Sequence, residues 1–137
     1  MIGSWSRYLA DALLEHLIGN TPFSVPASFY VGLWCNSLDE DSDGSTPGEV
    51  MAASYTRMEV VNEVASFGEI LDGEKRNANE ILFPVPTEDW GIVTHFAILD
   101  ADVDGSILFY GELATPKEVE MGKTISFPPA ALRIRFA

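Results

Sequence analysis

The sequence contains a single cysteine and few basic residues. Its 137 residues include 8 Lys and Arg against 21 Asp and Glu, which gives a formal net charge of −13. Cys35 has no partner for an intrachain disulfide, and its place in the apolar run 29–35 predicts a small buried hydrophobic residue rather than a nucleophile. The acidic excess repels nucleic-acid phosphates and anionic lipid surfaces, so we expect no nucleic-acid partner and no membrane partner.

Long hydrophobic runs are also absent, although 47% of the residues are hydrophobic. No window reaches the ~18 consecutive apolar residues of a membrane span. The start, Met1 to Arg7, lacks a basic segment followed by an uninterrupted apolar stretch. We therefore expect a protein that is made and used in soluble form, without secretion through a signal peptide.

Catalytic signatures are missing as well. No serine lies in a G-x-S-x-G elbow, and the two histidines, His16 and His95, have neither H-x-x-x-H spacing nor a cysteine partner. We expect each histidine to be a half-buried structural residue. The sequence thus predicts no catalytic, cofactor-binding or metal-ligating residues, and a protein that is not an enzyme.

Paired acids keep an enzymatic alternative open. Glu88 with Asp89, and Glu118 with Glu120, offer two carboxyl groups each, and a glycosidase needs two such groups at a defined separation across a sugar cleft. Surface charge is the simpler explanation of these pairs, and we prefer it.

One acidic segment resembles part of a calcium loop. Asp39, Asp41 and Asp43 alternate ahead of Gly44, as the oxygen ligands of such a loop do. The bidentate acid of that pattern is missing, because Val50 stands where it belongs. We interpret Asp39 to Asp43 as a solvated acidic loop, with a weak cation site as the alternative.

The first 20 residues predict an amphipathic helix of about four turns over residues 4–18. Gly19 and Asn20 follow it as a stop signal. The apolar positions with helical spacing are Trp5, Leu9, Ala12, Leu13, His16 and Leu17. The remainder, residues 21–137, changes to short apolar runs separated by Pro, Gly, Asn and Asp, which is typical of β-structure.

We therefore predict a mainly β protein, a single domain over residues 1–137 with a β-sandwich or jelly-roll-like core and an N-terminal helix. Two long surface loops are expected at residues 36–53 and 71–80. Asp104-Gly105 should turn an antiparallel hairpin, and Leu132 to Phe136 has the cleanest alternation of a strand. The predicted strands are 28–34, 55–62, 81–83, 92–99, 106–113, 124–127 and 132–136.

The chain resembles a family of small bacteriophage virion proteins known as tail fibre proteins. The resemblance is strongest over the segment Trp90 to Ala101, followed by residues 105–113 and by Thr115-Pro116-Lys117. Weaker matches occur in the same order along the rest of the chain, at residues 17–19, 27–33, 54–57 and 81–84. The chain departs from the family pattern by the acidic run Asp39 to Asp43 in the first long loop and by the charged segment Asp72 to Arg76 in the second.

This resemblance implies a virion structural protein, either a tail or tail-fibre component or a capsid decoration protein. Such a protein is assembled in the bacterial host cytoplasm, and its partners are other virion proteins and copies of itself, with a homotrimer as our specific expectation. The predicted helix is the first candidate for a contact surface through Trp5 and Tyr8. Alternatively, it caps the β core by burying Leu9, Leu13 and Leu17.

A host-receptor module that binds or cleaves carbohydrate is the second functional class. Trp34, Trp90, Tyr55 and Tyr110 provide flat aromatic faces on which a host surface glycan could stack. In a β-rich protein, however, such residues more often belong to the core or to an interface. Composition therefore favours the structural class.

Overall fold

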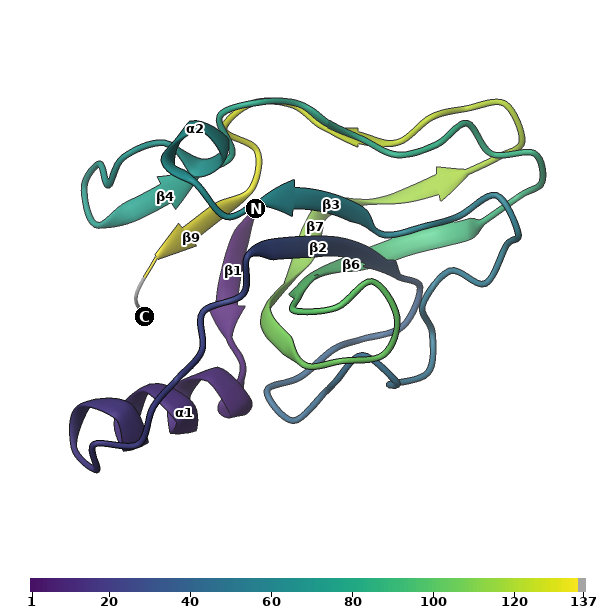
Figure 1. Cartoon of the computed structure of the whole chain (residues 1–137). Helices are drawn as coiled ribbons and strands as arrows, with labels where there is room; N and C mark the ends of the chain where they lie inside the picture. The colour runs from purple at the N-terminus through teal and green to yellow at the C-terminus, as the bar shows by residue number, and fades with distance from the viewer. Residues whose placement is uncertain (136–137) are drawn as a thin grey trace.

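The computed structural model describes residues 1–135 and is mainly β, with one substantial helix (Figure 1). The mainly β fold class with an N-terminal helix is thereby confirmed. In chain order the elements are β1 (Ile2–Trp5), α1 (Arg7–Leu17), β2 (Ser28–Trp34), β3 (Met58–Val61), α2 (Val64–Phe67), β4 (Glu74–Arg76), β5 (Ile81–Leu82), β6 (Gly91–Leu99), β7 (Ile107–Val119), β8 (Ser126–Phe127) and β9 (Arg133–Arg135).

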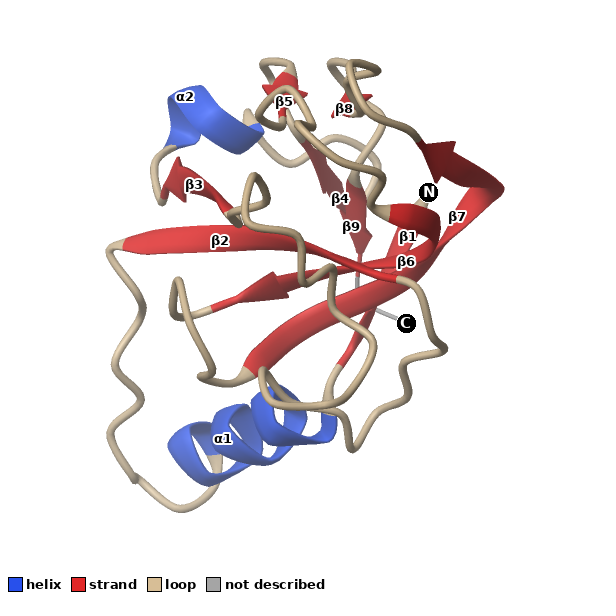
Figure 2. Ribbon diagram, turned by 90° about the vertical axis from the view of Figure 1, so that its right-hand side faces the viewer, coloured by secondary structure: helices blue, strands red, loops and turns tan. Residues whose placement is uncertain are grey.

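Seven strands form one curled sheet, in the order β3-β2-β6-β7-β1-β9-β4 (Figure 2). β1 joins both ends of the chain to this sheet, because it pairs antiparallel with β7 and parallel with β9. The other neighbours in the sheet are antiparallel. β5 and β8 form a separate two-stranded sheet.

The two sheets enclose a hydrophobic core. Phe127 of β8 makes edge-on ring contacts with Phe83 and with Phe96 of β6, at centroid distances of 6.1 Å. On the opposite face of the large sheet, Trp34, Ala97 and Leu99 form a second cluster under Leu38. Residues 31–34 of β2 and 96–99 of β6 are thus buried on both faces of the sheet, which explains why these parts of the two strands contain no polar side chain.

The N-terminal helix begins later than the sequence predicted. Residues 2–5 form β1, and Ser6 caps α1 by accepting a hydrogen bond from the backbone N–H of Leu9 at 3.1 Å. Trp5 therefore lies on a strand, where its ring meets Phe109 edge-on at 5.7 Å. Residues 2–5 form a strand rather than the first turn of the helix because they pair with β7 and β9, which lie far away in the sequence.

The predicted β6–β7 hairpin is confirmed. Asp104 and Gly105 have φ values of 54° and 75°, and the Asp100 carboxylate accepts a hydrogen bond from the Ser106 N–H at 2.8 Å. β7 continues six residues beyond its predicted end at Leu113. Pro116 lies within this extension, and a proline is tolerated where a strand has no neighbour on the side of its missing N–H.

The segment 71–80 is not simply a surface loop, because residues 74–76 form β4. β4 pairs with β9, and Glu74 and Asn77 are buried. The Asn77 side chain donates to the backbone carbonyls of Asn79 and Pro128 and accepts from the Leu132 N–H. The prediction of a surface loop over 71–80 was therefore wrong at residues 74–76. Their charged side chains are typical of a loop, but here they form ion pairs in a strand at the edge of the sheet.

The other predicted strands occur with shifted ends. β3 is shorter than the predicted 55–62, β5 and β8 are two-residue strands within 81–83 and 124–127, and β9 covers 133–135. Phe136, the last residue of the predicted 132–136 strand, lies outside the described residues. Neither helix in the described part is long and apolar enough to cross a membrane.

Candidate interaction surfaces

The acidic segment 39–43 folds upon itself. The Asp39 carboxylate accepts hydrogen bonds from the Asp41 N–H and the Ser42 hydroxyl, and the Asp43 carboxylate accepts from the N–H and hydroxyl of Ser45. The bonds from Ser45 lower the pKa of Asp43. These carboxylates stabilise turns in the loop, and within residues 1–135 no cluster of three or more His, Cys, Asp or Glu has the geometry of a metal site.

Arg7 connects this loop to the beginning of α1. Its guanidinium contacts Glu40 at 2.5 Å and Asp41 at 2.6 Å, and its backbone N–H donates to the Glu40 carbonyl. All three side chains are more than half exposed, so these ion pairs position the loop but add little stability.

Gly44 ends the acidic segment, and its role is close packing. A Cβ at this position would lie 1.7 Å from the Asp104 carbonyl oxygen, and the Gly44 N–H donates to the Gly105 carbonyl. The glycine that completes the calcium-like pattern thus allows the 36–53 loop to touch the β6–β7 turn.

A buried arginine holds the same junction together. The side chain of Arg57 is only 2% exposed, and its five N–H groups make five hydrogen bonds. Two are donated to the Glu49 carboxylate, at 2.7 and 2.9 Å, and three to backbone carbonyls of residues 44, 101 and 104. Its guanidinium also lies 5.8 Å from the ring centre of Trp34.

Tyr55 completes this network. Its hydroxyl donates to Glu49 at 2.7 Å and accepts from the Leu33 N–H at 3.0 Å. Burial, together with the nearby Glu49 carboxylate, raises the Tyr55 pKa far above its ordinary value. The sequence predicts a strand over 55–62 and offers Tyr55 for glycan stacking, but it does not predict the pairing of Arg57 and Tyr55 with Glu49. An arginine in the apolar surroundings of a predicted strand is the signal that implies a buried carboxylate partner.

The acid pairs do not form facing catalytic carboxylates. Glu88 accepts a hydrogen bond from the Ala53 N–H, and Asp89 accepts one from the Met121 N–H, so each joins a loop to its neighbour. Glu120 makes an exposed ion pair with Lys123 at 3.0 Å.

The two histidines lie on different elements, and Cys35 directly follows Trp34, the register partner of His95. His95 is half-buried on β6 beside Thr94, as expected, whereas His16 is exposed near the end of α1 and contacts the Thr21 carbonyl oxygen. The half-buried prediction was therefore wrong for His16, because the helix end projects from the body. Cys35 is half-buried, and burial raises the pKa of its thiol, which opposes nucleophilic chemistry.

The aromatic residues considered for glycan stacking lie largely inside the fold. Trp34 is fully buried and Trp90 is 5% exposed, while Tyr55 belongs to the network around Arg57. Among the large aromatic side chains of residues 1–135, Tyr8 is the one classed as exposed. The interior positions of Trp34 and Trp90 do not favour the carbohydrate alternative.

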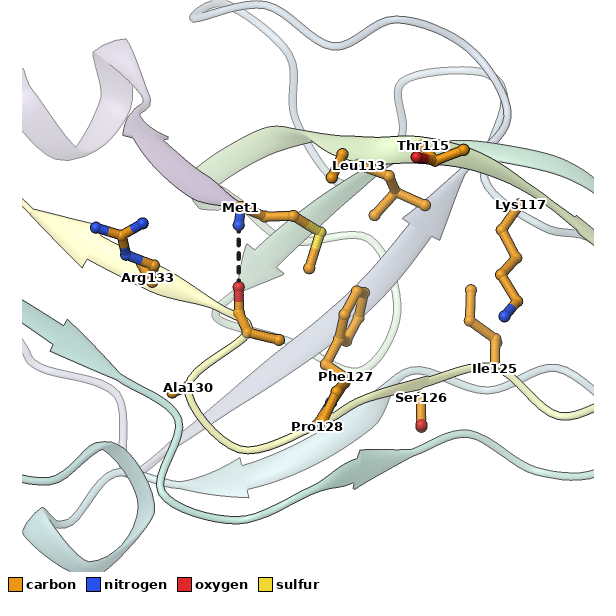
Figure 3. Close-up of a pocket in the computed structure, with 12 residues that line it drawn as sticks. Met1, Leu113, Thr115, Lys117, Ile125, Ser126, Phe127, Pro128, Ala130 and Arg133 are labelled. Atoms are coloured by element: carbon orange, nitrogen blue, oxygen red, sulfur yellow. Dashed lines mark hydrogen bonds between the residues drawn. The ribbon is translucent and has the colours of Figure 1, made fainter.

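A groove of about 470 Å³ lies between the second half of β7 and β8 (Figure 3). Leu113, Ile125 and Phe127 provide its apolar lining, and Lys117 and Arg133 lie at opposite ends in the figure. No carboxylate lines this groove, so it lacks the acids of a glycosidase cleft.

The most conspicuous apolar surface is on α1, which projects at one end of the molecule (Figure 1). Leu14, Leu17 and Ile18 are 59, 75 and 85% exposed, and their spacing of three and four residues places them on one stripe. Leu9, in the first half of the helix, is 5% exposed and packs inward. The alternative that the helix caps the core by burying Leu9, Leu13 and Leu17 is therefore wrong for Leu17, because only the first part of the helix reaches the sheet.

The family assignment follows from the sequence match that covers this fold. The chain matches the family model described as podophage GP4 fiber I protein gp80 over residues 4–135. The chain belongs to this family of bacteriophage fibre proteins. Its matched region extends from β1 to β9, and the resemblance to phage tail fibre proteins found in the sequence is confirmed. No curated protein matches the chain.

Proposed function

We propose that this protein is a non-enzymatic structural component of a phage tail fibre and acts by assembling with copies of itself and with other virion proteins. Membership of the fibre family supports this role and favours a fibre over capsid decoration. Assembly would take place in the bacterial host cytoplasm, where virion proteins are made.

The exposed stripe of Leu14, Leu17 and Ile18 is the observation that carries the assembly proposal. The helix buries Leu9 near its beginning and exposes three large aliphatic residues at its end, where no other part of residues 1–135 covers them. Water in contact with these residues is released when a second surface covers them, at about 25 cal/mol for each Å² of apolar area buried. Ion pairs from Arg7 fix the beginning of the helix to the 36–53 loop, so the stripe is presented in a defined position.

A closed homo-oligomer covers this stripe in every copy with a single type of interface, because symmetry repeats that interface. We propose a trimer, in which α1 of each copy contacts its neighbour. This arrangement retains the helix as the contact surface expected from the sequence, but transfers the contact from Trp5 to the exposed aliphatic residues and Tyr8.

Sedimentation velocity of the isolated chain tests this proposal. We expect the wild-type chain to sediment as an oligomer and the Leu14→Gln, Leu17→Gln double variant to sediment as a 15.0 kDa monomer. Glutamine keeps nearly the helix propensity of leucine, so α1 itself should persist. The matched control replaces Met51 and Val103, which are exposed apolar residues away from α1, with glutamine and should remain oligomeric.

Two outcomes contradict the proposal. One is a wild-type chain that remains monomeric at every concentration accessible to the experiment. The other is an oligomer that the helix variant and the control variant weaken equally, since the stripe would then have no specific role.

A further inference from the structure

The large and the small sheet each leave an edge strand beside the same groove. Within residues 1–135, β3 pairs with β2 alone and β5 pairs with β8 alone. A groove of about 360 Å³ separates them, and its lining includes all four residues of β3 and both residues of β5. In Figure 2, the β5–β8 sheet lies on the same side of β2 as β3.

Backbone hydrogen bonds show which way each edge points. The Asn62 N–H donates to the Ala27 carbonyl beside the β2–β3 ladder, so strand alternation directs the backbone groups of Glu59 and Val61 away from β2. Likewise, the Phe83 N–H donates to the Ile125 carbonyl, which directs the backbone of Leu82 away from β8. The groove is therefore bordered by strand edges on two sides.

Side chains around the groove define the chemistry of an occupant. Met58, Val60 and Ile81 are buried or half-buried, whereas Val61 and Leu82 are about half exposed. The charged lining residues are Glu59 and Glu80, both exposed, and no Lys or Arg is among them. A strand inserted here would place alternate residues toward apolar and acidic surroundings.

Charge also selects between possible occupants. A second copy of this chain paired at the groove would bring Glu59 at the edge of β3 against its own equivalent. Charged residues on a short edge strand are a common means of preventing such self-pairing. A segment that carries Lys or Arg avoids this repulsion and gains attraction to Glu59 and Glu80.

We propose that the groove between β3 and β5 binds an extended segment of another polypeptide, in which apolar residues alternate with Lys or Arg, by strand addition to β3. The inference deepens the assembly role proposed above by naming the chemistry of a heterologous partner. It concerns a surface separate from α1, so either proposal can fail without the other.

A synthetic peptide of alternating valine and lysine is the probe, titrated against the isolated chain by fluorescence anisotropy. We expect saturable binding, and slower hydrogen exchange at the Glu59 and Val61 amides when the peptide is bound. An alternating valine and glutamate peptide should not bind. A valine-lysine peptide N-methylated at alternate amides should also fail, because it cannot complete the ladder.

Two substitutions at one position separate backbone pairing from charge. Glu59→Pro removes an N–H that faces away from β2, so the β2–β3 ladder survives, and we expect peptide affinity to fall about tenfold or more. Glu59→Gln keeps the N–H and should weaken binding only about two- to fivefold, with less dependence on salt. Thermal unfolding confirms that each variant is folded, and the N-methylated peptide gives the same test on the wild-type chain.

Absence of saturable binding by the valine-lysine peptide would overturn the proposal. So would binding that leaves exchange at Glu59 and Val61 unchanged, or binding that the N-methylated peptide reproduces. Self-association of the wild-type chain that Glu59→Pro abolishes would assign the groove to a second copy instead.

Discussion

Within residues 1–135, Glu74 is the one acidic residue that is buried. It accepts hydrogen bonds from Arg76 at 2.6 Å and from Arg133 at 2.8 and 3.1 Å. These bonds and the attraction of the two guanidinium groups lower its pKa from 4.5 to about 2. At the scale of single residues, the ionised carboxylate of Glu74 thus connects β4 to β9.

The Glu74 pKa predicts a defined pH dependence of stability. Since the folded-state pKa is depressed, the contribution of Glu74 is fully present above the unfolded-state value near 4.5 and is lost as the pH falls toward 2. We expect the difference in free energy of unfolding between wild type and Glu74→Gln to shrink over this interval. Urea unfolding of both chains at several pH values measures it, and a difference that does not change with pH would be incompatible with the assigned ion pairs.

At the scale of elements, the Arg57 network joins the 36–53 loop to the β6–β7 turn. Arg57→Met removes two of the hydrogen bonds to Glu49, which keeps the one from Tyr55, and removes the Arg57 donors from three backbone carbonyls. Breaking a buried ion pair costs about 3–5 kcal/mol, and because the Glu49 side chain is 21% exposed we expect a loss near the lower end, about 3 kcal/mol. Equilibrium unfolding in urea provides the measurement.

Arg7→Met is the matched control, because Arg7 also pairs with carboxylates of the same loop but is 55% exposed. We expect it to lose much less stability than Arg57→Met, because water screens exposed ion pairs. Equal losses in the two variants would mean that burial of Arg57 does not govern the stability of this junction.

Sequence patterns predicted the elements whose structure depends on nearby residues. The β2 boundaries at Ser28 and Trp34 and the Asp104-Gly105 turn are as predicted, because apolar runs and turn residues act locally. β1 and β4 were missed, since Ile2 pairs with Arg133 and Glu74 pairs with Arg135, and distant partners leave no periodic signal. The exposure of the end of α1 was not predicted either. Helical spacing shows which residues align along a helix, but not which part of the helix contacts the sheet.

At the scale of the whole molecule, the fold presents two different surfaces that we propose serve assembly. The α1 stripe is apolar and projects from one end, whereas the groove between β3 and β5 is bordered by strand edges and carboxylates. An apolar surface favours copies of the same chain, and an acidic groove favours a basic partner. A fibre subunit with both features can contact its own copies and a different virion protein at the same time.

Cryo-EM of the intact phage particle is the most direct test of this account. We predict that the chain lies in the tail fibre, in several symmetry-related copies, with Leu14, Leu17 and Ile18 of each copy buried against a neighbouring copy. A single copy per particle, or copies whose α1 helices remain in solvent and touch no other copy of the chain, would contradict it.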